Sequence, residues 1–179
     1  MVQFHATTIC AVRRGPDDIC IGGDGQVTMG ETAIMKNGAK KVRKIYKNSV
    51  VSGFAGSVAD AFALEARFEE LLQKFSGNLL RSAVEVALGF RDDKYPRKLD
   101  AQMIVADKDT MLIVSGGGEV IEPESNVCSI GSGSLYAMAS ARALMENTDL
   151  DAMEIAKKSM KIASDMCVYT NDHLTIEEV

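Results

Sequence analysis

The stretch TTICAVRRGPDDICIGGDG, residues 7–25, decides how the chain begins to fold. Residues 8–14 and 18–23 are short runs of apolar and β-branched residues, a composition typical of strands. The Gly-Pro-Asp cluster at 15–17 separates them and favours a turn. We therefore predict a β-hairpin, with threonine hydroxyls at the start of its first strand and Asp24 just beyond its second.

A second pair of strands and two helices follow the hairpin. Residues 41–46 and 49–56 have strand character and are separated by two polar residues. From Ser57 the apolar residues recur every three or four positions, which predicts a helix that ends at Gly77. Ser57 and Asp60 have the spacing of a capping box, and Asn78 is suited to cap a second helix that ends before Pro96.

The second half of the chain repeats this order of elements. Strands are predicted at 102–107, 110–116 and 126–133, helices at 134–147 and 151–167, and a last strand at 173–178. Runs of strands followed by runs of helices favour segregated layers over an alternating βαβ arrangement. We predict an α+β fold, a four-layer αββα sandwich, built as one domain from residues 7–179.

Composition and charge narrow the class of function. A net charge of −5 and a pI near 5.1 argue against a protein that mainly holds nucleic acid, and favour a peptide, protein or small-molecule partner. The chain has no run near the roughly 20 apolar residues of a spanning helix and no signal peptide pattern, so we expect a soluble, cytoplasmic protein with no membrane partner. The four scattered cysteines have no CxxC pair and indicate reduced, buried thiols.

The scarcity of histidine limits the possible nucleophiles. His5 and His173 are the only two, which leaves little material for a Ser-His or Cys-His arrangement. A threonine at a chain terminus needs no histidine, because its own α-amine, with a reference pKa of about 7.7–8.0, can act as the base. Thr7 and Thr8 are equally ordinary strand formers. A threonine site of this kind also needs a nearby cation, to lower the pKa of the amine, and a carboxylate to hold that cation.

Three residues are candidates to complete such a site. Asp24 lies between glycines at a strand end, although Asp-Gly is also a common turn signal. Lys41 begins the third predicted strand, within a basic stretch that otherwise suits a solvated face. Gly56, at a predicted helix start, could offer an N–H group to an oxyanion or serve only as a capping turn.

A different class of function is a nucleotide-binding module that uses the glycine-rich loops. No loop matches GxxxxGK[ST] or a strand-to-helix GxGxxG, so the sequence gives this class little support.

Several motifs together resemble one family. The segments TTICAVRRG, GGDGQVTMG, KKVRK, GFAGSVADAF, IGSGS and CVYTND occur in the order and spacing of the HslV (ClpQ) family of bacterial proteasome-like peptidases. The resemblance covers nearly all of residues 7–179. It implies an N-terminal-nucleophile αββα fold and a threonine endopeptidase in two stacked hexameric rings. Its unfolded protein substrates would come from an HslU-type AAA+ unfoldase, an allosteric partner that uses the ATP, and no organic cofactor is implied.

The resemblance also assigns roles to individual residues. It implies Thr7 as nucleophile, Asp24 as the acid, Lys41 as the cation, Gly56 as the oxyanion donor and Ser132 as an aid to proton transfer near the amine. A sodium ion would bind through backbone carbonyls, and the positions concerned are Ser164, Cys167 and Thr170. Position 164 is more commonly glycine in the family, although carbonyl ligation does not depend on the side chain.

The segment MVQFHA, residues 1–6, precedes the predicted nucleophile. We expect it to be a leader, and autolysis between Ala6 and Thr7 is our hypothesis for its removal, since Thr7 has a free α-amine only after that bond is cleaved. The alternative is a noncatalytic shell subunit of the same fold that keeps its leader.

Overall fold

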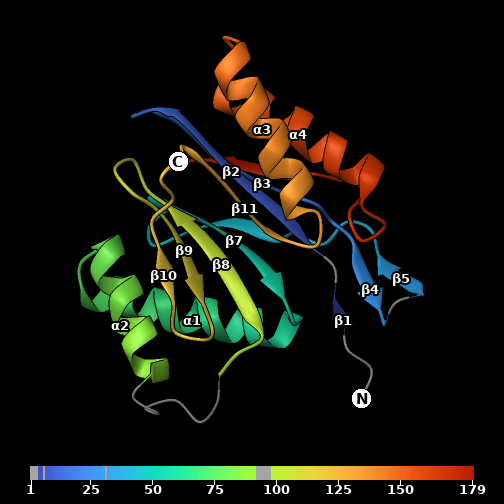
Figure 1. Ribbon diagram of the computed structural model, residues 1–179. Helices are drawn as coiled ribbons and strands as arrows, with labels where there is room; N and C mark the ends of the chain where they lie inside the picture. Colours follow the sequence, from blue (N-terminus) through green and yellow to red (C-terminus); the bar gives the residue numbers. More distant parts are fainter. Residues whose placement is uncertain (1–3, 6, 31, 92–97) are drawn as a thin grey trace.

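The computed structural model describes residues 4–5, 7–30, 32–91 and 98–179, and shows two β-sheets packed between two pairs of helices (Figure 1). Within these ranges the first sheet has the strand order β11-β2-β3-β12. Its strands are antiparallel and run over Val127–Gly131, Thr8–Gly15, Asp18–Gly23 and Thr175–Glu178 in that order. The predicted opening hairpin is therefore confirmed, with its turn between β2 and β3.

The second sheet is also antiparallel and has the order β10-β9-β8-β7-β6. In chain order its strands are β6 Val42–Ile45, β7 Val50–Gly56, β8 Ala101–Ala106, β9 Met111–Ser115 and β10 Val120–Ile121. Helices α1 Val58–Lys74 and α2 Leu79–Arg91 cover its outer face, and α3 Ser134–Asn147 and α4 Ala152–Met166 cover the outer face of the first sheet (Figure 1). The four-layer αββα sandwich is confirmed.

Strand β2 illustrates why the sequence forms layers. Ile9 and Ala11 pack in the apolar layer between the two sheets, whereas Cys10 and Val12 pack against α3 and α4. Side chains alternate across a strand, so a strand covered on both faces needs apolar residues at every position. Each of the three interlayer spaces has its own buried apolar cluster. The sandwich is thus held by burial on both faces of both sheets.

The structure differs from the sequence prediction in a few local features. A small three-stranded sheet in the order β1-β4-β5 was not predicted; its strands are Phe4–His5, Val27–Met29 and Ala33–Lys36. Strand β10 was also missed because it has only two residues. The predicted capping box is wrong: the Ser57 side chain makes no cap hydrogen bond, and Asp60 instead accepts from the backbone N–H of Asp100 at 2.9 Å.

Other local predictions are confirmed. The Asn78 side chain accepts a hydrogen bond from the N–H of Arg81 at 2.9 Å, as expected for the cap of α2. Pro96, expected to lie beyond that helix, is outside the described residues. The four cysteines are free and buried. Among the helices of the described ranges, none is long and apolar enough to cross a membrane.

Candidate active site

The carboxylate of Asp24 is the centre of the site. Asp24 follows directly after β3 and is completely buried. Its oxygens accept hydrogen bonds from the backbone N–H of Thr8 at 2.7 Å and of Gln26 at 2.9 Å, and from Lys41 Nζ at 3.1 Å. A buried carboxylate needs this number of donors to remain ionised away from water. Asp24 is therefore built into the fold as a fixed negative charge.

Lys41 supplies the matching positive charge. It precedes β6, and only 4% of its surface is exposed, although most other basic residues in this stretch are exposed as expected. Its Nζ donates to Asp24 Oδ1 at 3.1 Å and to the carbonyl of Gln26 at 2.5 Å. Burial lowers the pKa of Lys41 from its ordinary value, and the charge and hydrogen bond of Asp24 partly offset that effect. The structure thus brings the predicted acid and cation together.

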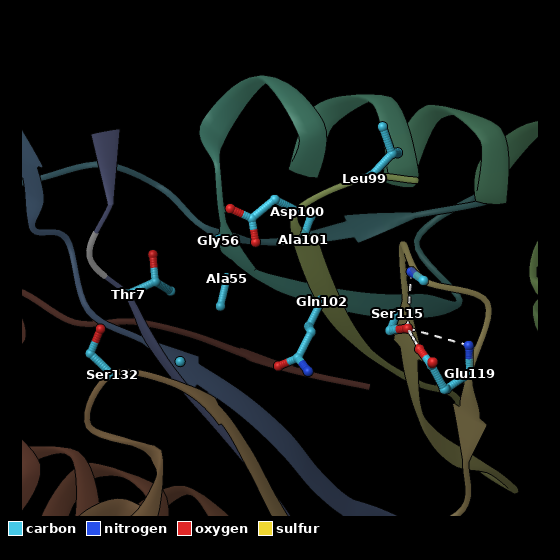
Figure 2. Close-up of a pocket in the computed structure, with 12 residues that line it drawn as sticks. Thr7, Ala55, Gly56, Leu99, Asp100, Ala101, Gln102, Ser115, Glu119 and Ser132 are labelled. Carbon is cyan, nitrogen blue, oxygen red and sulfur yellow. Dashed lines mark hydrogen bonds between the residues drawn. The ribbon is translucent and has the colours of Figure 1, made fainter. Parts of the chain in front are cut away.

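Thr7 lies next to this pair and is 5% exposed. The next peptide nitrogen, that of Thr8, donates its hydrogen to Asp24 at 2.7 Å. The carbonyl of Thr7 accepts a hydrogen bond from the N–H of Ser132 at 2.8 Å. The backbone on the C-terminal side of Thr7 is therefore fixed from two directions, while the residue itself lines two cavities. Figure 2 shows Thr7 and Ser132 at one end of the larger cavity, with Gly56 and Asp100 nearby.

Gly56 occupies a backbone conformation that favours glycine. It ends β7 with a φ of +112°, and a Cβ at this position would lie 2.5 Å from the carbonyl oxygen of Asp100. That same carbonyl accepts from the N–H of Ser57 at 2.8 Å, so the turn is held against residue 100. Gly56 lines both cavities together with Thr7. The predicted oxyanion donor is thus beside the predicted nucleophile.

Ser132 reaches the site through a second glycine turn. Gly131 has a φ of +95°, and a Cβ there would collide with the carbonyl of Thr7. The absence of a side chain lets the 131–132 backbone approach Thr7 closely. The Ser132 side chain is exposed and lines the larger cavity. The other four predicted catalytic residues therefore all lie close to Thr7.

The three predicted sodium ligands lie at the end of α4 and in the loop after it. Thr170 and Cys167 are buried, and the N–H of Thr170 donates to the carbonyl of Cys167 at 3.0 Å. The Thr170 hydroxyl is 2.7 Å from that of Thr8. No group of three or more His, Cys, Asp or Glu side chains suited to a metal occurs within the described ranges. A cation here would depend on carbonyl oxygens, which are the ligand type that hard ions prefer.

Two residues that support the site were missed in the sequence. The Gln26 side chain donates to the carbonyl of Val168 at 2.9 Å. The backbone N–H of Gln26 donates to Asp24, and its carbonyl accepts from Lys41. The Asn171 side chain accepts from the N–H of Gly25 at 3.1 Å and donates to the carbonyl of Asn37 at 3.0 Å. Gln26 lies in the motif GGDGQVTMG and Asn171 in CVYTND. Their presence in these two motifs is the feature of the sequence that could have indicated a role in the site.

Comparison with known proteins agrees with this geometry. An αββα sandwich with a threonine beside a buried Asp-Lys pair is the architecture of an N-terminal-nucleophile hydrolase. The family model described as "Proteasome subunit" matches residues 3–179. The chain therefore belongs to the proteasome subunit family.

Individual relatives give a finer view. The chain is 57% identical over 175 residues to the "ATP-dependent protease subunit HslV" of Caldanaerobacter subterraneus subsp. tengcongensis, an alignment that covers 98% of this chain and 99% of the relative. The structure of this chain resembles the crystal structure of eukaryotic HslV from Trypanosoma brucei, with a TM-score of 0.88 and 43% identity. The match covers 95% of this chain and 97% of that one. The fold alone is shared with Thiobacillus denitrificans BPH, with a TM-score of 0.69, 16% identity, and 96% of this chain and 97% of that one covered.

Proposed function

We propose that the chain is the threonine endopeptidase subunit of an ATP-dependent protease, with Thr7 as its nucleophile. The observation that carries the proposal is the position of Thr7 between a buried Asp24–Lys41 pair and the turn at Gly56. Buried charges are costly unless they are paired, so a pair placed beside a hydroxyl residue in a cavity wall is typical of a catalytic site.

The first half of the reaction follows from this arrangement. Once residues 1–6 are removed, the Thr7 amine accepts the proton of its own hydroxyl, and Oγ forms a bond to the carbonyl carbon of the scissile peptide. The Lys41 cation lowers the pKa of this amine, which keeps it neutral and able to accept a proton. The N–H of Gly56 donates to the developing oxyanion. Ser132 assists proton movement near the amine.

The second half returns the enzyme to its starting state. The tetrahedral intermediate collapses, the C–N bond breaks, and the leaving amine takes the proton from the Thr7 ammonium group. An ester between Thr7 and the acyl fragment remains. Water then attacks that ester and gives its proton to the Thr7 amine, which passes it to Oγ as the carboxylic acid leaves. No group other than those on this chain and water is needed.

The partner and the assembly are proposed from the same likeness. The bacterial relative is named an ATP-dependent protease subunit, so we infer that this chain receives unfolded proteins from an HslU-type ATPase, which activates it and hydrolyses the ATP. We further infer two stacked hexameric rings that enclose the active sites. The physical reason is that a peptidase open to solvent would degrade folded cellular proteins indiscriminately. A cytoplasmic location stays a prediction.

Sodium binding at the loop after α4 is a separate proposal. The donor set fits a hard cation, because Ser164 lies in the last turn of α4, where carbonyl groups lack intrahelical partners, and the Cys167 carbonyl has a second lone pair beside its hydrogen bond from Thr170. Thr170 contacts Thr8 in the strand that carries the site. Bound there, the ion would hold the loop that packs against Asp24 and Gln26, and the chemical step would still be carried out by Thr7.

The noncatalytic alternative predicts an inert site. A shell subunit would have no need for a buried lysine whose pKa is lowered by burial and which is aimed at a carboxylate beside Thr7. The two interpretations also differ at the N-terminus, because a shell subunit keeps residues 1–6 and an active subunit loses them. We favour the peptidase.

The test is to assay chains that begin at Thr7 with the ATPase partner and a fluorogenic peptide. We expect Thr7→Ala to lose turnover completely while its thermal unfolding stays close to that of the unmodified chain. Thr7→Ser keeps a hydroxyl and an amine, so it should retain measurable activity. Thr8→Ser is the matched control at the next position. Unchanged hydrolysis by Thr7→Ala would end the proposal.

A further inference from the structure

Two cavities meet at Thr7 and differ in their chemistry. The smaller, of about 60 Å³, is lined mainly by apolar residues and by two lysines: Val27, Phe54, Val58, Phe62, Lys40 and Lys41. The larger, of about 440 Å³, is lined by the polar side chains of Asp100, Gln102, Ser115 and Glu119. Both include Thr7 and Gly56. A peptide bond attacked by Thr7 therefore has a mainly apolar cavity on one flank and a cavity with two carboxylates on the other.

Glu119 is held in place at the far end of the larger cavity. Figure 2 shows Ser115 and Glu119 opposite Thr7, with Gln102 between them. The Ser115 hydroxyl donates to the Glu119 carboxylate, and the N–H of Ser115 donates to the carbonyl of Glu119 at 2.9 Å. The tight turn between β9 and β10 thus fixes a carboxylate that is otherwise exposed at the cavity wall.

Asp100 is fixed closer to the reacting bond. Its N–H donates to the buried carboxylate of Asp60 at 2.9 Å, and its carbonyl accepts from the N–H of Ser57 at 2.8 Å. These contacts lock residue 100 against the turn that carries Gly56. No arginine, lysine or histidine occurs among the described residues that line this cavity. Its two carboxylates therefore face a substrate without a lining cation to neutralise them.

We propose that the larger cavity is a specificity subsite for a cationic side chain, lysine or arginine, on the flank of the scissile bond opposite the apolar cavity. The inference rests on the proposed peptidase function. The ammonium or guanidinium group of the substrate would pair with Glu119 and Asp100, and the Gln102 amide oxygen is a further acceptor for its N–H groups. In a partly exposed site each carboxylate changes the rate by a few-fold to about tenfold.

The test uses internally quenched peptides in two orders, six peptides in all. In each peptide leucine stands on one side of the cleaved bond, and lysine, glutamine or glutamate stands on the other. The chain that begins at Thr7 is assayed with its ATPase partner. We expect kcat/KM to follow lysine over glutamine over glutamate in one of the two orders, with lysine favoured over glutamate by about tenfold or more.

Variants then show whether the cavity causes the preference. Glu119→Gln and Asp100→Asn should each lower kcat/KM for the lysine peptide about three- to tenfold and leave the glutamine peptide nearly unchanged. Glu119→Lys should favour the glutamate peptide. Glu124→Gln removes an exposed carboxylate that does not line the cavity and should leave the ratio of the three rates unchanged.

The outcomes separate this inference from the function on which it rests. If the glutamine peptide is cleaved but lysine gives no advantage in either order, the subsite inference is wrong and the peptidase stands. The same holds if a lysine preference persists in both carboxylate variants. If none of the peptides is cleaved, the proposed function itself fails, and the inference fails with it.

Discussion

Replacing Asp24 by asparagine removes one charge from the buried pair and keeps its shape. Asp24 is completely buried and Lys41 is 4% exposed, so neither charge has water to compensate for a lost partner. Breaking a buried ion pair from one side costs about 3–5 kcal/mol. The asparagine also has one acceptor oxygen in place of two, and an unpaired backbone N–H of Thr8 or Gln26 adds about 1–3 kcal/mol.

The expected loss in the free energy of unfolding is therefore at least about 3 kcal/mol, a large part of the roughly 5–15 kcal/mol that stabilises a domain. The assay is urea unfolding of Asp24→Asn beside Asp109→Asn, a control in which the carboxylate is exposed. Asp24→Asn combined with Lys41→Met removes both charges and should recover much of the lost stability without any recovery of activity.

Activity should fall further than stability. An unpaired Lys41 loses its proton more easily, and the Thr7 amine then loses the cation that keeps it neutral, so we expect turnover to drop at least about hundredfold. Peptide hydrolysis by folded Asp24→Asn, measured well below the temperature at which it unfolds, checks this. A variant that keeps half its turnover and unfolds within about 1 kcal/mol of the unmodified chain would refute the role assigned to the pair.

The remaining predictions concern the neighbouring residues. Gly56→Ala places a Cβ 2.5 Å from the Asp100 carbonyl at a φ of +112°, so it should unfold at lower urea and lose about hundredfold in rate, whereas Gly15→Ala, with open space around it, should do neither. Ser132→Ala keeps the backbone bond to Thr7 and should slow hydrolysis severalfold at unchanged stability, as rate and melting temperature together will show. The rate should rise with pH as the Thr7 amine loses its proton below its reference pKa of about 7.7–8.0. Lys41→Met should shift this rise to higher pH, because the Thr7 amine then lacks the cation that lowers its pKa; a pH profile with an unchanged midpoint would contradict the cationic role.

Much of the fold follows from short-range patterns. The order of strands and helices could be predicted because the period of apolar residues changes from that of a buried strand to that of a helix at Ser57, and again after Gly133. Strands β4 and β5 could not be predicted, because Ile34 and Met35 are exposed and the segment has no apolar face that packs in the core. The Ser57 cap failed because Asp60 is used by a backbone group forty residues away in sequence.

The site was predictable only in part. The local sequence indicates an aspartate at a strand end, Asp24, and a lysine at a strand start, Lys41. The distance of 3.1 Å between Lys41 Nζ and Asp24 Oδ1, and the burial of both residues, arise from how the two sheets pack. The supporting contacts of Gln26 and Asn171 join segments that are distant along the chain, so no local pattern specifies them. The resemblance to a known family supplied the combination of residues, and the structure supplies the distances.

The most direct measurement compares three forms of the protein in one peptidase assay with the ATPase partner. One form begins at Thr7 with a free amine, one begins at Thr7 with that amine acetylated, and one keeps residues 1–6 through an uncleavable Ala6–Thr7 linkage, each verified by intact mass. The account predicts hydrolysis by the first form alone. Equal hydrolysis by the acetylated form or by the form that keeps its leader would contradict it.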